Sequence, residues 1–213
     1  MLVVAIPAMS QGSGVRINAY SNYIFSDHVD SYYDANNYYN GYVRDGFQWG
    51  VGAEFMVRPE MGVELSYLRE DTKAALKNYK YPLAYHDYDL AVNYIMVSGT
   101  RYFRKPGGRV EGFGGLGAGL GIFNAKDPAD GSTTNLTKFS WQLRAGAIIW
   151  ASDAVGVRLQ AQLQSAVQAI GGGIYVGTGG AGGGVSTYST IYQFGLGGGL
   201  VFKLHGQGAG TKK

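Results

Sequence analysis

The sequence contains no cysteine, which excludes disulfides, catalytic thiols and metal sites built from thiolates. Charge is also scarce, because Asp, Glu, Lys and Arg make up 15% of the chain where roughly a quarter is typical of soluble domains. The net charge is only +3 and no basic run occurs, so no nucleic-acid partner is indicated. No stretch approaches the ~18 apolar residues of a membrane helix. A chain that is 46% hydrophobic must therefore bury its apolar residues by strand alternation.

The 213 residues correspond to about one domain, long enough for a closed sheet of eight strands and too short for a large porin. The chain holds 35 Gly and 17 Tyr. Glycine is costly in helix interiors and tyrosine is enriched at membrane interfaces. Composition therefore favours closely packed strands with aromatic belts.

The segment Tyr188–Leu204 shows the pattern most clearly. Its even positions are almost all apolar or aromatic, and most odd positions are small or polar, with Ile191 and Val201 as exceptions. A soluble strand usually has five or six residues, whereas this alternation runs for about seventeen. Such a length, with aromatics near both ends, is typical of a lipid-facing strand that closes a transmembrane barrel.

Alternation recurs in seven further segments: Val15–Phe25, Phe47–Arg58, Met61–Glu70, Asp87–Phe103, Val110–Phe123, Lys138–Ile149 and Val155–Gln164. In the fourth segment Tyr88, Leu90, Val92, Tyr94 and Met96 form the apolar row that is expected to face lipid, and the end of this segment is ambiguous. The connections alternate between long and short, so all long loops fall on one side.

This pattern predicts an all-β fold, an eight-stranded antiparallel up-and-down transmembrane β-barrel. The alternative is a soluble lipocalin-type barrel, whose apolar row would line the interior. Residues 1–10, MLVVAIPAMS, are expected to be the end of a truncated signal peptide, with a short N-terminal strand as the alternative. Residues 14–204 would form the barrel and residues 205–213 a short periplasmic tail.

Three stretches resemble the small outer-membrane β-barrels related to the OmpA transmembrane domain and OmpX: GFGGLGAGLGIF at 112–123, WQLRAGAIIWASDAVGVRLQAQ at 141–162, and FGLGGGLVFKL at 194–204. The resemblance implies a Gram-negative outer-membrane protein with periplasmic termini and extracellular long loops. It also implies contact with outer-membrane lipid, lipopolysaccharide and the barrel-assembly machinery. Family members commonly end on an aromatic residue, whereas here Lys203–Lys213 follow Phe202.

Six charged residues are predicted to face the lumen: Arg16, Glu54, Glu64, Glu111, Arg144 and Arg158. Eight strands enclose a space that side chains nearly fill, and a buried charge is costly unless it is paired. We therefore expect a mixed-sign plug in which Gln48, Gln142 and Gln160 act as bridges. The alternative is a narrow gated path through the same residues, which would make the protein a porin-like channel for small solutes or ions.

The first two long loops are rich in tyrosine and are predicted to form an extracellular aromatic rim: Tyr32, Tyr33, Tyr38, Tyr39, Tyr42, Tyr79, Tyr81 and Tyr85. Tyrosine offers a large amphipathic contact area at low entropic cost, as binding surfaces require. The rim is expected either to complete the interfacial girdle against lipopolysaccharide or to bind a surface protein or glycan.

No cofactor, metal or catalytic site is predicted. Residues 112–117 match the dinucleotide pattern G-x-G-x-x-G, but more strand follows and no helix N-terminus is available to bind phosphate. Loop aspartates lack the spacing of a calcium loop. A lipid-modifying enzyme remains an alternative, with His28 beside Ser26 and Asp27, or His86 beside Asp87, at the outer rim.

Overall fold

The computed structural model describes residues 14–32, 38–78, 86–126, 128, 131, 133–167, 174–177, 180–183 and 191–204. Within these ranges no helix is long and apolar enough to cross a membrane. The described residues form twelve strands: β1 (Val15–Ile24), β2 (Asp27–Tyr32), β3 (Tyr38–Val43), β4 (Gly46–Arg58), β5 (Met61–Asn78), β6 (His86–Arg104), β7 (Val110–Lys126), β8 (Thr133–Trp150), β9 (Val155–Val167), β10 (Ile174–Gly177), β11 (Gly180–Gly183) and β12 (Ile191–Leu204).

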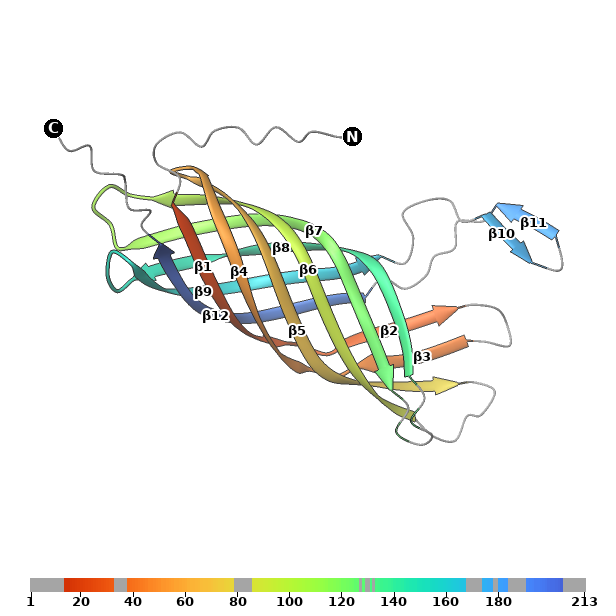
Figure 1. Cartoon of the computed structure of the whole chain (residues 1–213). Helices are drawn as coiled ribbons and strands as arrows, with labels where there is room; N and C mark the ends of the chain where they lie inside the picture. The colour runs from red at the N-terminus through yellow and green to blue at the C-terminus, as the bar shows by residue number, and fades with distance from the viewer. Residues whose placement is uncertain are drawn as a thin grey trace.

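Eight of these strands close into an antiparallel barrel (Figure 1). Around the wall each strand pairs with its neighbours in the order β1, β4, β5, β6, β7, β8, β9, β12, and β12 pairs with β1 to close the ring. Closure leaves no free sheet edge in this ring, which is what a strand protein needs in order to cross lipid. The predicted eight-stranded barrel is confirmed.

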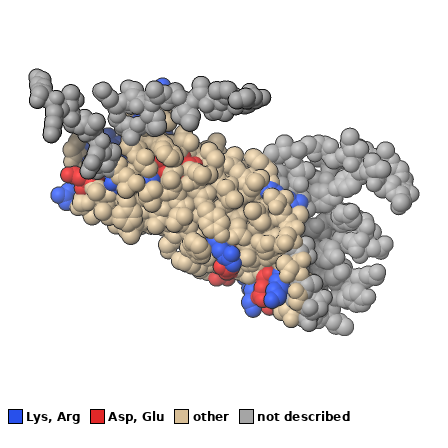
Figure 2. All heavy atoms as spheres, viewed as in Figure 1, with Lys and Arg blue, Asp and Glu red and all other residues tan. Residues whose placement is uncertain are grey.

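Successive residues of each strand face opposite sides of the wall, and the outer side is the apolar one. On β9, for example, Leu159 is 54% exposed whereas Arg158 and Gln160 are 1% and 5% exposed. Figure 2 shows that Lys, Arg, Asp and Glu gather toward the two ends of the barrel and leave the visible band between them largely free of charge. This arrangement excludes the lipocalin-type alternative, whose apolar row would point inward.

One row was predicted on the wrong side. Leu90, Val92, Tyr94 and Met96 of β6 are buried in the barrel interior, and Ile95 is among the exposed residues of the same strand. The register explains the error, since Asp89 and Asn93 occupy the outward positions above the lipid-facing residues. Polar residues are tolerated on the outer side at this height because it lies beyond the lipid belt. The ambiguous end of this segment is regular, because β6 pairs with β5 and β7 without a register shift, and a register shift lies between Met56 and Arg58 of β4.

The two ends of the barrel differ. Val15 pairs with Leu204, so the first and last described strands begin and end together. Three short connections, at residues 59–60, 105–109 and 151–154, lie at this same end (Figure 1). The longer connections lie at the opposite end, as the alternation of long and short segments predicted.

At that opposite end the strands extend further than the alternation indicated. The expected first loop contains a hairpin of β2 and β3, and β3 continues the sheet by pairing with the end of β5. The Gly-rich connection between β9 and β12 contains the paired strands β10 and β11. Above the lipid belt the outer face is polar, so the apolar outer row ends while backbone pairing continues.

Leu159→Arg should lower the free energy of unfolding by about 2–4 kcal/mol, because it places a charge on the lipid-facing surface near mid-height. Thr133→Arg, on an exposed position at the far end of β8, is the matched control and should change stability little. Denaturant unfolding in lipid vesicles measures both. Equal losses at the two positions would contradict the lipid-facing assignment.

Candidate functional site

The interior of the barrel holds the six charged side chains predicted for the lumen. They comprise three guanidinium groups and three carboxyl groups, all at most 6% exposed: Arg16, Arg144, Arg158, Glu54, Glu64 and Glu111. They come from β1, β4, β5, β7, β8 and β9, so this layer joins opposite walls of the barrel. A balanced set of buried charges is the condition under which such groups are tolerated in a low-dielectric interior.

The centre of this layer is an ion pair between β5 and β8. Arg144 Nη2 donates to Glu64 Oε2 over 2.5 Å, and Arg144 Nη1 donates to the Tyr20 hydroxyl over 2.8 Å. The Tyr20 hydroxyl in turn donates to Glu64 Oε1, and Asn18 Nδ2 donates to the same oxygen over 2.7 Å. Glu64 is therefore held by three donors from two different strands, which fixes its position in the lumen.

Arg158 lies between two phenol groups and not directly against a carboxylate. Its Nη1 donates to the Tyr20 hydroxyl and its Nη2 to the Tyr102 hydroxyl, each over 3.3 Å. Tyr102 donates to both oxygens of Glu54 over 2.7 Å. Each phenol accepts from the arginine and donates to a glutamate, so the positive charge is linked through two hydroxyls to Glu54 and Glu64. The guanidinium also stacks over the Phe113 ring, 4.5 Å from its centroid.

The third pair closes the layer toward the end of the short turns. Arg16 Nη1 donates to Glu111 Oε1 over 2.6 Å, and Trp150 Nε1 donates to Glu111 Oε2 over 3.3 Å. The Arg16 guanidinium lies 4.4 Å from the centroid of the Tyr102 ring. Beside these groups the interior is filled by a buried apolar cluster: Met56, Tyr102, Phe113, Ile148, Trp150 and Val201.

The glutamines do not bridge the ion pairs as predicted; they form a separate layer nearer the opposite end. Gln162 Nε2 donates to Gln48 Oε1 over 2.7 Å, and Gln48 Nε2 donates to Gln164 Oε1 over 2.9 Å. Gln160 donates to Asn22 and to Gln162. The side-chain amide of Gln142 has no hydrogen-bond partner among the described residues. A side-chain amide carries both a hydrogen-bond donor and an acceptor. The glutamines can therefore pair with one another, while the charged groups use partners of their own.

Beyond the glutamines the interior is closed by the row that was predicted to face lipid. A buried cluster on β5, β6 and β7 fills this level: Leu68, Leu90, Val92, Tyr94, Met96 and Phe123. Tyr94 donates to Gln193 Oε1 over 2.5 Å, and Gln193 Nε2 donates to Glu70 Oε2 over 2.7 Å. Apolar and polar groups therefore occupy the lumen at every described level.

Most of the predicted tyrosine rim lies outside the described side chains. Tyr33, Tyr79, Tyr81 and Tyr85 are outside the described residues, and only the backbone is described at Tyr32, Tyr38 and Tyr39, on β2 and β3. Tyr42 is described fully; it is 45% exposed and packs edge-on against His28, with ring centroids 4.6 Å apart.

Below this rim, ion pairs that sequence reasoning did not single out lie on the outer surface: Arg44–Asp87, Arg69–Asp71 and Lys73–Asp89. The hydrogen bonds from Arg69 hold the pKa of Asp71 below its usual range. A ladder of hydrogen bonds runs beside them around the wall, from Tyr67 to Asn93, Asn124 and Asn135. These groups mark the height at which the surface changes from lipid-facing to polar.

The residues weighed as catalytic are described in part. Asp27 Oδ2 accepts from the backbone N–H of Tyr192 over 2.8 Å, so this carboxylate caps a strand. His28 is in contact with Tyr42, and the side chain of His86 lies outside the described set. Among the described residues no group of three or more His, Cys, Asp and Glu side chains could hold a metal ion.

No protein-family model and no curated protein sequence matches the chain. Solved structures do match. The chain is similar to outer membrane protein OprG from Pseudomonas aeruginosa, with TM-score 0.65 and 13% identity over 92% of this chain and 97% of that one. It is also similar to Neisserial surface protein A, with TM-score 0.60 and 15% identity over 91% and 100% of the two chains. For outer membrane protein AlkL in lipid bilayers the values are 0.50 and 11%, over 98% and 99%. These similarities confirm the fold of small outer-membrane β-barrels.

Glu64→Gln should lower the free energy of unfolding by about 3–5 kcal/mol, because it leaves the Arg144 guanidinium buried without its carboxylate. The control is Asp71→Asn, which breaks an exposed arginine–aspartate pair of similar geometry and should cost less than about 1 kcal/mol. Denaturant titration of the refolded proteins in lipid compares them. A loss at Glu64 no larger than that at Asp71 would show that the buried pair contributes little.

Proposed function

We propose that the protein is a non-catalytic outer-membrane barrel, sealed along its axis, whose strands above the lipid belt present a binding surface to the outside of the cell. The proposal rests chiefly on the filled interior. Charges of both signs are paired from mid-barrel to the end of the short turns, beside one apolar cluster, and a second apolar cluster fills the interior toward the opposite end. An ion crossing this layer would have to separate buried pairs, whose rupture costs about 3–5 kcal/mol each.

The surface role is supported by the part of the sheet that buries nothing against lipid. β2 and β3 pair beyond the closed ring, and β3 extends the wall along β5. The sheet at this end is stiffened by paired backbone and by exposed ion pairs. Rigid strands that present aromatic and charged groups lose little entropy when they bind a partner. A surface protein or a glycan, or the sugar headgroups of lipopolysaccharide, are the partners that this end would suit.

Passive transport is the competing function, and planar-bilayer recording distinguishes the two. We expect no large, stable conductance from the wild type. Glu54→Gln weakens the contact with Tyr102 and should lower thermal stability while opening at most small, flickering currents. Steady channels from the wild type, with selectivity that changes in Glu54→Gln at unchanged stability, would make solute transport the function instead.

The orientation is tested with single cysteines, which are unambiguous labels because the chain has none of its own. Tyr42→Cys lies at the end of the long connections and Ala151→Cys in a short turn at the other end. A membrane-impermeant maleimide added to intact cells should label only the first. It should label the second once the outer membrane is permeabilised. Labelling of Ala151→Cys in intact cells would reverse the topology.

A further inference from the structure

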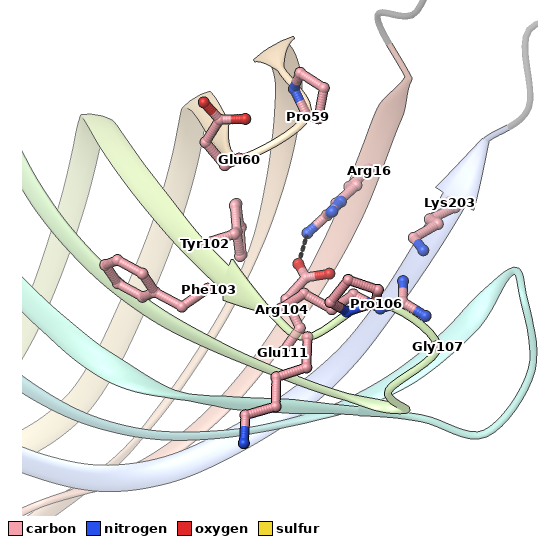
Figure 3. Close-up of a pocket in the computed structure, with 11 residues that line it drawn as sticks. Arg16, Pro59, Glu60, Tyr102, Phe103, Arg104, Pro106, Gly107, Glu111 and Lys203 are labelled. Atoms are coloured by element: carbon pink, nitrogen blue, oxygen red, sulfur yellow. Dashed lines mark hydrogen bonds and ion pairs between the residues drawn. The ribbon is translucent and has the colours of Figure 1, made fainter.

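A pocket of ≈850 Å³ opens at the end of the barrel where the short turns lie (Figure 3). It is lined by residues of β1, β6, β7 and β12 and of two turns, at 59–60 and 105–107. Its roof is the Arg16–Glu111 ion pair, which is also the last layer of the sealed interior. On the proposed function, in which the interior is sealed, the pocket is a recess and not the entrance of a channel.

The recess carries more positive than negative charge. Four basic side chains line it, Arg16, Arg104, Lys105 and Lys203, against the two acidic side chains Glu60 and Glu111. Glu111 is already engaged at both oxygens, by Arg16 and by the indole N–H of Trp150. None of the described carboxylates lies within ion-pair distance of the other three basic groups.

Two of these cations are neighbours by register. Arg16 and Lys203 are paired positions on β1 and β12, and Figure 3 shows their side chains on the same side of the wall. Like charges directly opposite each other on one face of a sheet are destabilising. Lys203 is held there by the face of the Trp150 ring, with its Nζ 3.6 Å from the centroid. A pair of cations held together in a recess is stabilised by an anion placed between them.

Arg104 completes the arrangement. Its Nε donates to the Gly108 carbonyl over 2.9 Å, which fixes the side chain across its own turn. Arg104 is also the register partner of Glu111, so it stands next to the roof of the recess. Guanidinium and ammonium donors that line one recess suit a tetrahedral oxyanion with several acceptor oxygens.

We propose that this recess is a binding site for a phosphate group, contacted by Lys203 and Arg104 and bordered by Arg16. The phosphate is that of a phospholipid headgroup or of a free phosphate, and the two share the chemistry that the site recognises. The site is independent of the binding surface at the opposite end of the barrel. Binding removes the repulsion between β1 and β12, so it stabilises the seam at which the barrel closes.

The test is calorimetric titration of the full chain in non-ionic detergent micelles with two probes, inorganic phosphate and short-chain phosphatidylglycerol. Lys203→Gln and Arg104→Gln should each weaken binding about tenfold, the loss of one charge-assisted hydrogen bond. Arg109→Gln removes the same charge from an exposed position that does not line the recess, and it should leave affinity within about twofold. Binding of both probes supports a general phosphate site, and binding of the lipid alone supports a headgroup site.

Thermal unfolding provides a second readout. Phosphate should raise the melting temperature of the wild type and of Arg109→Gln, and it should no longer do so in Lys203→Gln. Without phosphate, Lys203→Gln should be at least as stable as the wild type because one of two like charges is gone. Two results would overturn the proposal. One is that neither probe binds the wild type, and the other is that Arg109→Gln loses as much affinity as Lys203→Gln and Arg104→Gln.

Discussion

The structure depends on one electrostatic constraint: three guanidinium groups lie inside a barrel of eight strands and each must be compensated there. Arg16 and Arg144 have carboxylate partners, and Arg158 is linked through phenol hydroxyls to Glu54 and to Glu64, which is also the partner of Arg144. These contacts join strands on opposite sides of the wall. They therefore tie the register of the whole ring to a single layer, because slipping any strand by one residue would turn its charged groups toward lipid. The same compensation that makes the charges tolerable also fills this level of the lumen with side chains.

Most of this fold could be predicted from the sequence, because lipid-facing and lumen-facing residues alternate along each strand of a membrane barrel. Within the lipid belt every outward position must be apolar, so the rows of β4, β8, β9 and β12 could be assigned residue by residue. The six lumen charges followed from the same rows. Their pairing did not, since which guanidinium meets which carboxylate depends on the tilt and stagger of the strands around the ring. Tyr20 and Tyr102, which link the layer together, were not singled out for this role, and Tyr102 lies in the ambiguous end of its segment.

The errors share a cause. On β6 an apolar row was assigned to lipid because it was the more hydrophobic one, yet Val92 and Tyr94 pack inside while Asn93 faces out. Above the lipid belt the outer face is free to be polar, so hydrophobicity no longer distinguishes the two sides. For the same reason the extensions of β2, β3 and β5 read as loops, although their backbones continue the sheet. A strand can be recognised from the sequence only where its two faces lie in different environments, because only there do apolar and polar side chains alternate.

A double-mutant cycle on the Glu64–Arg144 pair tests the central claim, that compensation of buried charge organises the barrel. The two single variants, Glu64→Gln and Arg144→Met, and the double variant are unfolded by denaturant in lipid vesicles. Each single variant leaves one charge uncompensated, so the double variant should recover a large part of the loss, with a coupling of about 2–3 kcal/mol. Additive losses would contradict the account, because they would show that the two groups stabilise the barrel independently of each other.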